Sequence, residues 1–188
     1  MGARWEWRAF GAGFGGAEDR FGEPERVQES DEVYLVSRVT DANVKVRDGL
    51  LDVKELEHVD ADGLEQWTPV LKAEFPVSTD QVAAVLDRLG VTSELSRDAY
   101  SLDELLDEVV GFSPDLLAVR VHKRRQRYTI GGCMSELTDL HTDVGDTRTV
   151  AVESEDASAV TAAVRDLGLA DLTNTSFPRG LKALAGPA

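Results

Sequence analysis

The sequence predicts an α+β protein built mainly on antiparallel β-strands, with helices at the periphery. Strand-like segments follow one another along most of the chain, whereas helical periodicity appears only near the middle and the end. There is no strict β-α-β alternation, which a doubly wound parallel sheet requires. Several strands are joined by short turns, and such hairpin-like connections favour an antiparallel sheet that can curl into a barrel.

The expected strands show the alternation of side chains that a half-buried strand requires. In Arg4–Phe10, Trp5 and Trp7 fall on one face and Glu6 and Arg8 on the other. Two further strands meet at Asp48-Gly49, a typical hairpin turn. In chain order, the strand candidates are Arg4–Phe10, Glu32–Val39, Asn43–Val46, Leu51–Leu56, Pro69–Val77, Leu116–Ile130, Met134–Leu140 and Thr147–Glu155.

The helices are predicted from apolar spacing and from capping residues. Ser78-Thr79-Asp80 is an N-cap region, apolar residues follow at helical spacing, and Gly90 is the expected stop. The other helix candidates are Ser101–Val110, Ser158–Leu167 and Asn174–Leu184.

Composition limits the classes of protein to which the chain can belong. Its 188 residues suit a single domain spanning 1–188, and its formal net charge is −15. An acidic surface argues against duplex nucleic acid as a partner. No apolar run is long enough to span a membrane, no signal peptide is evident, and Cys133 is the only cysteine. We therefore expect a cytoplasmic protein without a membrane partner; the oligomeric state stays open.

One strand is strongly basic in spite of this acidity. Five of the ten residues of Val119–Tyr128 are Arg or Lys. Because side chains alternate along a strand, one face should carry Lys123, Arg125 and Arg127, and the other Arg120, His122 and Arg124. Such a concentration of positive charge predicts a bound anion or nearby carboxylates.

The glycine-rich segment after the first strand is a weaker signal. Gly11 to Gly16 matches the pattern G-x-G-x-x-G. A dinucleotide site also needs an apolar helix that begins at the third glycine, and here charged residues, Gly22 and Pro24 follow instead. We expect a mobile loop over 11–29.

Further charges alternate along other strands. Lys45 and Arg47 share one face, and Lys54 follows one hairpin later. Arg and Lys at strand spacing can hold a chain of phosphates. Glu153 and Glu155 share a strand face, and carboxylates that converge on a cavity can hold Mg²⁺ or Mn²⁺. The plainer alternative is a solvated charged face on an acidic α+β protein without an active site.

The order of these motifs resembles that of the CYTH superfamily, the triphosphate tunnel metalloenzymes. The motifs are Glu6-x-Arg8, Lys45-x-Arg47, Lys54, Lys72-x-Glu74, Lys123-x-Arg125-x-Arg127, Glu136 and Glu153-x-Glu155. The resemblance covers about Trp5 to Leu184. It implies an eight-stranded antiparallel barrel, open at both ends, with charged side chains filling the tunnel.

The resemblance also implies roles for individual residues. The expected metal ligands for Mg²⁺ or Mn²⁺ are Glu6, Glu136, Glu153 and Glu155, and the expected catalytic residues are Glu153, Glu155 and Lys54. The expected substrate-binding residues are Arg8, Lys45, Arg47, Lys54, Lys72, Lys123, Arg125 and Arg127. The implied activity is metal-dependent hydrolysis of a triphosphate or polyphosphate.

One departure from the family pattern bears on catalysis. The N-terminal signature E-x-E-x-K is replaced by Arg4-Trp5-Glu6-Trp7-Arg8. Arg4 removes one carboxylate and adds repulsion toward a metal ion, while anion binding is retained. Two alternatives therefore stay open: a module that binds polyphosphate or a phosphorylated ligand without turnover, and a nucleotide cyclase of the same fold.

Overall fold

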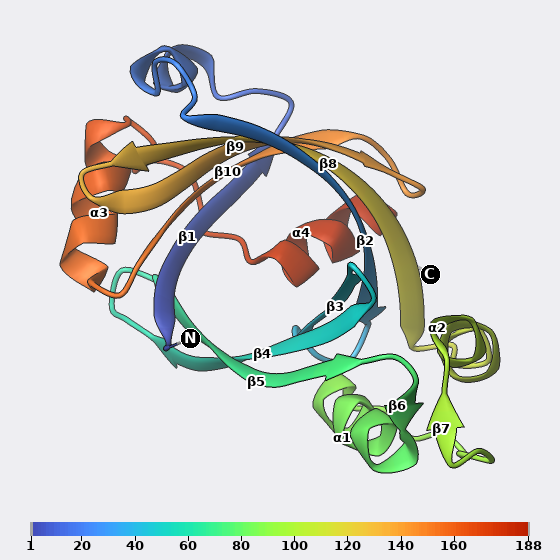
Figure 1. The fold of residues 1–188 in the computed structure, drawn as a ribbon. Helices are drawn as coiled ribbons and strands as arrows, with labels where there is room; N and C mark the ends of the chain where they lie inside the picture. Colours follow the sequence, from blue (N-terminus) through green and yellow to red (C-terminus); the bar gives the residue numbers. More distant parts are fainter. Residues whose placement is uncertain (1, 188) are drawn as a thin grey trace.

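A closed barrel of antiparallel strands dominates the computed structural model, which describes residues 2–187 (Figure 1). The strands follow the order β1-β10-β9-β8-β2-β3-β4-β5 around the barrel. Their bounds are β1 Arg4–Gly11, β2 Arg26–Ser37, β3 Asn43–Arg47, β4 Leu50–Val59, β5 Glu65–Glu74, β8 Leu116–Ile130, β9 Cys133–Thr142 and β10 Thr147–Ser154. The predicted α+β fold with an eight-stranded antiparallel barrel is confirmed.

Local sequence explains the tight turns. Asp48 (φ 51°) and Gly49 (φ 72°) are both in the left-handed region, as a two-residue hairpin turn of type I′ requires. The turn closes the β3–β4 hairpin at the predicted position, and Lys45 lies opposite Asp52. The turn therefore fixes which side chains of β3 and β4 face the barrel interior.

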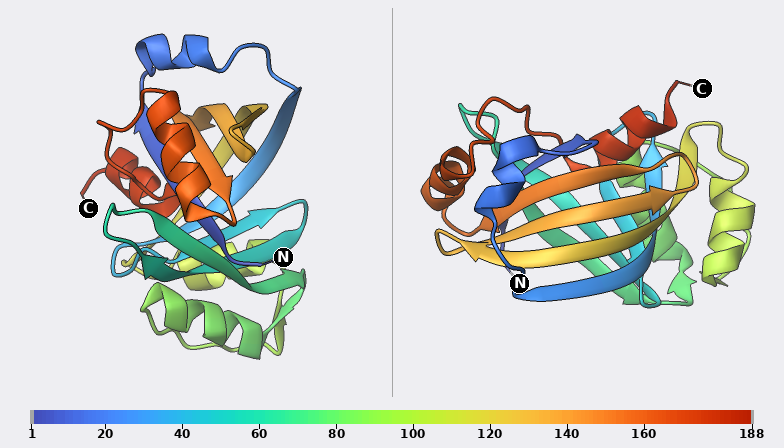
Figure 2. Two further views of the ribbon diagram at one scale, coloured as in Figure 1. Left: turned by 90° about the vertical axis from the view of Figure 1, so that its left-hand side faces the viewer. Right: turned by 90° about the horizontal axis from the view of Figure 1, so that it is seen from above.

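Most helices pack on the outside of the barrel (Figure 2). Helix α1 (Thr79–Leu89) begins at Ser78 with a capping box and ends at Gly90 in the left-handed conformation, as predicted. Its buried side chains join the outward-facing apolar residues of β3 and β4. Helix α3 (Ala157–Asp166) covers the outer faces of β1 and β10.

Several predicted boundaries were wrong. The segment 11–29, expected as a loop, contains the 3₁₀ helix η1 (Gly15–Arg20), and β2 begins at Arg26. The buried side chains of Ala17 and Phe21 join the outer core there. The predicted helix Ser101–Val110 is divided into α2 (Leu102–Glu104) and the π-helix η2 (Leu105–Val110). Two short strands, β6 (Val77–Ser78) and β7 (Ala99–Tyr100), pair beside them.

The last helix, α4 (Phe177–Ala185), lies at one end of the barrel and packs against its inner face. In Figure 1, α4 lies within the ring of strands. Phe177 and Leu181 pack against inward-facing residues that include Tyr34, Val119 and Leu140. The bond from Lys182 Nζ to Asp41 Oδ1 (2.7 Å) anchors the helix at this end. The barrel interior is therefore apolar at the α4 end.

A glycine allows this close packing of α4. A Cβ atom added to Gly180 would lie 2.2 Å from Cε2 of Phe10, closer than any side chain permits. The Phe10 ring also meets the Phe177 ring edge to face at 5.6 Å. The close approach of α4 to Phe10 therefore requires a residue without a side chain at position 180.

Candidate functional site

Strand β8 supplies the basic wall of the barrel interior. Lys123 and Arg125 are buried and point inward, whereas Arg120 and Arg124 are exposed on the outer face. Arg127 also points inward and is half-buried. The alternation predicted for this strand is thus observed, with β2 and β9 as its neighbours.

A buried carboxylate that the sequence did not single out lies at the centre of these cations. The Glu32 side chain on β2 is 0% exposed. Its Oε2 lies 2.9 Å from Lys123 Nζ and 3.6 Å from Lys45 Nζ, and its Oε1 lies 3.7 Å from Arg47 Nη1. Arg125 Nη2 also donates to Oε1. One carboxylate therefore partly neutralises four cations.

The electrostatics of Glu32 follow from this arrangement. Burial alone would raise the pKa of Glu32, but Lys123, Lys45 and Arg125 hold it well below the usual carboxyl range. The Tyr34 hydroxyl adds a hydrogen bond of 2.9 Å to Oε2. Glu32 is therefore ionised in the folded protein.

Lys123 lies at the boundary between the charged and the apolar parts of the interior. Its Nζ donates to the Tyr34 hydroxyl at 2.7 Å and lies 3.8 Å from the centre of the Phe177 ring. Burial, together with nearby Lys45 and Arg125, brings the pKa of Lys123 well below its ordinary value in spite of Glu32. A bound anion would raise that pKa and favour the charged amine.

A second ion-pair group lies on β1, β9 and β10. Arg8 Nε donates to Glu6 Oε1 at 2.9 Å, and Arg8 Nη1 donates to Glu136 Oε1 at 3.2 Å and to Thr149 Oγ1 at 2.9 Å. Burial would raise the pKa of Glu6, yet Arg8 and Lys54 lower it below its ordinary value. The Arg8 guanidinium thus occupies the space between two of the predicted metal ligands.

Glu153 faces this group from β10, directly opposite Glu6 in the β1–β10 register. Burial and the negative charge of Glu6 raise the pKa of Glu153 above its ordinary value. Arg4 Nη1 lies 3.9 Å from Glu153 Oε1. Lys54 and Arg4, which replaces the first acid of the family signature, both act to lower the pKa of this carboxylate.

Several buried donors in the interior have no partner. Arg125 Nη1, Arg127 Nε and Thr138 Oγ1 are buried and make no hydrogen bond. Lys54 and Arg127 have no carboxylate within 4.0 Å in the part of the chain that the structure describes. Buried donors in native proteins are nearly always paired. These groups are therefore available to an anion.

The predicted metal ligands do not form a metal centre. Glu6 and Glu136 bind Arg8, and Glu155 lies beyond the end of β10 with an exposed side chain. Nowhere in residues 2–187 do three His, Cys, Asp or Glu side chains gather closely enough to hold a metal ion. As arranged, these residues do not fit Mg²⁺ or Mn²⁺.

The remaining predicted residues lie on β3, β4 and β5. Lys72 and Glu74 are exposed at the end of β5, and Lys45, Arg47 and Lys54 are half-buried. A cavity of about 410 Å³ beside the Asp48-Gly49 turn is lined mainly by outward-facing residues, among them Arg120, His122 and His141. This cavity therefore belongs to the outer surface of the barrel. None of the helices in residues 2–187 combines the length and the apolar character needed to cross a bilayer.

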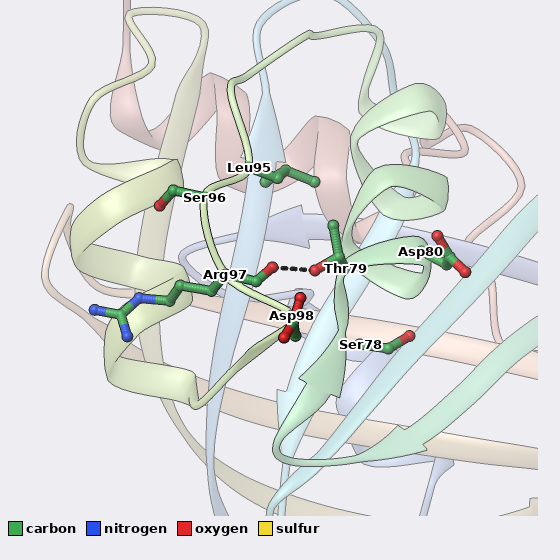
Figure 3. Close-up of a pocket in the computed structure, with 7 residues that line it drawn as sticks. All are labelled: Ser78, Thr79, Asp80, Leu95, Ser96, Arg97 and Asp98. Atoms are coloured by element: carbon green, nitrogen blue, oxygen red, sulfur yellow. Dashed lines mark hydrogen bonds between the residues drawn. The ribbon is translucent and has the colours of Figure 1, made fainter.

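Another pocket, of about 380 Å³, lies outside the barrel at the start of α1 (Figure 3). Thr79 Oγ1 donates to the Arg97 carbonyl there. The Arg97 side chain points away from the pocket and binds Glu108, with Nε 2.7 Å from Oε2. The polar groups of this pocket therefore serve local structure.

No protein-family model matches the chain, and no curated protein matches it. Among solved structures, a proposed adenylyl cyclase from Hippeastrum, described as having a dominant triphosphatase activity, is 13% identical (TM-score 0.45), with 90% of this chain and 89% of that chain covered.

Two further structures are similarly distant. A conserved protein from Pyrococcus furiosus is 18% identical (TM-score 0.46; 95% and 98% covered), and a proposed adenylate cyclase from Bacillus halodurans is 9% identical (TM-score 0.47; 94% and 96% covered). Likeness at this level says nothing about what the chain binds. The fold that the structure shows is a closed eight-stranded antiparallel barrel with charged side chains on its inner face.

Proposed function

We propose that the protein binds a small polyanionic phosphate, such as tripolyphosphate, inside the barrel. The observation that carries this proposal is the set of buried donors without partners on Arg125 and Arg127. In residues 2–187, Lys54 likewise has no carboxylate within 4.0 Å. Guanidinium groups match phosphate oxygens in geometry, and such charge-assisted bonds are strong in a poorly solvated site. A ligand with several phosphoryl groups can reach donors on both β4 and β8.

The cations would hold the phosphate chain, and the barrel wall would shield it from bulk water. Lys123 and Arg125 are oriented by Glu32, while Arg127 and Lys54 have donors to spare. Metal-dependent hydrolysis is the finer prediction from the family resemblance. Because Arg8 binds both Glu6 and Glu136, the arrangement favours binding without turnover over hydrolysis.

Isothermal titration calorimetry with tripolyphosphate tests the proposal. Arg125→Gln should weaken binding by about tenfold or more, because a hydrogen bond between charged groups contributes about 1.5–3 kcal/mol. The matched control is Arg124→Gln, which removes the same charge from the exposed face of the same strand. Equal affinities for the two variants, or no binding by the wild type, would contradict the proposal.

The same samples separate binding from catalysis. Phosphate release from tripolyphosphate with Mg²⁺ or Mn²⁺ would establish a hydrolase. Cyclic AMP formed from ATP would establish a cyclase. Tight binding of tripolyphosphate that EDTA leaves unchanged, without either product, would establish a binding module.

A further inference from the structure

Thr138 on β9 carries a buried hydroxyl that the protein leaves without a partner. The residue is 1% exposed, and its Oγ1 makes no hydrogen bond. It lies directly opposite Arg125 in the β8–β9 register. Because directly opposite residues point to the same face of a sheet, the Thr138 hydroxyl faces the barrel interior beside Arg125.

The neighbouring groups show why this hydroxyl stays free. On β10, Thr149 lies opposite Thr138, and its hydroxyl is taken by Arg8 Nη1 at 2.9 Å. Arg125 on β8 donates from Nη2 to Glu32 on β2, whereas Nη1 of the same guanidinium has no partner in residues 2–187. The Thr138 hydroxyl and Arg125 Nη1 are thus neighbouring buried donors without partners, whereas the polar groups around them are already paired.

An unpaired buried hydroxyl destabilises a protein. Valine has almost the same shape as threonine and would fill the same space without that cost. A threonine at this position is therefore explained by a ligand that pairs with its hydroxyl when bound. Because the neighbouring group of Arg125 is also a donor, that ligand must offer hydrogen-bond acceptors.

We propose that the Thr138 hydroxyl binds the ligand, donating a hydrogen bond to an oxygen of the phosphoryl group that Arg125 Nη1 contacts. This inference rests on the proposed function, because it takes the interior ligand to be a phosphate. It adds an uncharged donor to a site otherwise built from cations. The strength of the Thr138 contact therefore depends on where one phosphoryl oxygen of the ligand lies, and not on the total charge of the ligand.

The test compares Thr138→Val with Thr138→Ser and Thr68→Val, using calorimetry with tripolyphosphate and thermal unfolding without ligand. Thr68 is the matched control because its Oγ1 is also buried and unpaired. It lies opposite Glu55, whose carboxylate binds Arg88 of α1 on the outside of the barrel.

Thr138→Val should weaken tripolyphosphate binding by about tenfold while leaving the unfolding temperature unchanged or raised. Thr138→Ser, which keeps the hydroxyl, should bind within about threefold of the wild type. Thr68→Val should have the same unfolding temperature as Thr138→Val. Its affinity for tripolyphosphate should equal that of the wild type. If Thr138 has only a structural role, the affinity of Thr138→Val for tripolyphosphate should fall only when its unfolding temperature also falls.

The two proposals fail in different ways. If the wild type binds no tripolyphosphate, the proposed function and the role of Thr138 both fall. If the wild type and Thr138→Val bind equally well, only the role of Thr138 falls. A loss of stability in Thr138→Val that accounts for its weaker binding would also overturn that role.

Discussion

Glu32 on β2 and Arg125 on β8 form an ion pair that is almost completely shielded from water, with side chains 0% and 4% exposed. The pair joins two neighbouring strands on the inner face of the barrel. Lys123, Lys45 and Arg47 surround the same carboxylate. The cations of the interior are therefore held together by one anion, and this arrangement has measurable consequences.

Replacing Glu32 should cost stability when no ligand is present. Glu32→Gln leaves buried cations without their counter-charge, and loss of one partner of a buried ion pair costs about 3–5 kcal/mol. Urea unfolding at pH 7 measures the loss. Glu29→Gln, on the outer face of the same strand with a side chain 61% exposed, is the control and should change stability by less than about 0.5 kcal/mol. Equal losses would contradict the role of Glu32.

The effect of Glu32 on stability should depend on pH. Its pKa in the folded protein lies below the ordinary value, since the surrounding cations outweigh the effect of burial. The charged form therefore contributes stability above the pKa of the unfolded chain, and that contribution is lost as pH falls. The difference in free energy of unfolding between wild type and Glu32→Gln should have its largest value at pH 7. This difference should decrease below about pH 4.5. A gap that widens with acidity would be inconsistent with this ion pair.

Divalent metals should not strengthen binding of tripolyphosphate. Glu6 and Glu136 are engaged by Arg8, and a bound Mg²⁺ would reduce the negative charge that the interior cations attract. Calorimetric affinity measured in EDTA should equal or exceed that measured in excess Mg²⁺. Tighter binding with Mg²⁺ would show that the carboxylates rearrange around a metal.

Arg4→Glu should move the site toward metal binding. The change restores the first acid of the family signature and removes the cation that lies 3.9 Å from Glu153. Hard oxygen ligands then become more numerous beside Glu153. Titration of free Mn²⁺ by electron paramagnetic resonance should show tighter binding than in the wild type, and Arg4→Gln serves as the variant that removes charge alone. Identical titrations for the two variants would argue against a latent metal position.

Gly180→Ala should destabilise the protein, although alanine ordinarily favours a helix by about 1 kcal/mol. The new methyl group would meet the Phe10 ring, and such overpacking costs about 1–3 kcal/mol. Thermal unfolding measures the change, with Gly16→Ala as a control because an added Cβ there meets nothing within 4 Å. Phe10→Leu combined with Gly180→Ala should recover part of the loss.

Local sequence was sufficient to predict much of the barrel. Alternation along β8 placed Lys123 and Arg125 on the inner face, and Asp48-Gly49 located the β3–β4 hairpin. Ser78 and Gly90 marked the two ends of α1. Each of these features depends on neighbouring residues and on backbone preferences that can be recognised in a single segment.

The parts that were missed depend on contacts between distant segments. Glu32 is one of 35 acidic residues, and only the pairing of β2 with β8 brings it to Lys123 and Arg125. Nothing near Thr138 indicates that its hydroxyl would be left unpaired. Glu155 matched a motif, but β10 ends one residue before it, so the residue lies outside the wall on which the motif depends. The entry of α4 into the barrel likewise depends on Phe10, far away in sequence.

The position of α4 makes the barrel interior charged along only part of its length. Phe177 and Leu181 occupy the part that Tyr34, Val119 and Leu140 line. The cations begin at Lys123, whose Nζ lies 3.8 Å from the centre of the Phe177 ring. The barrel is therefore asymmetric along its axis, and a nine-residue helix at the far end of the chain sets this asymmetry.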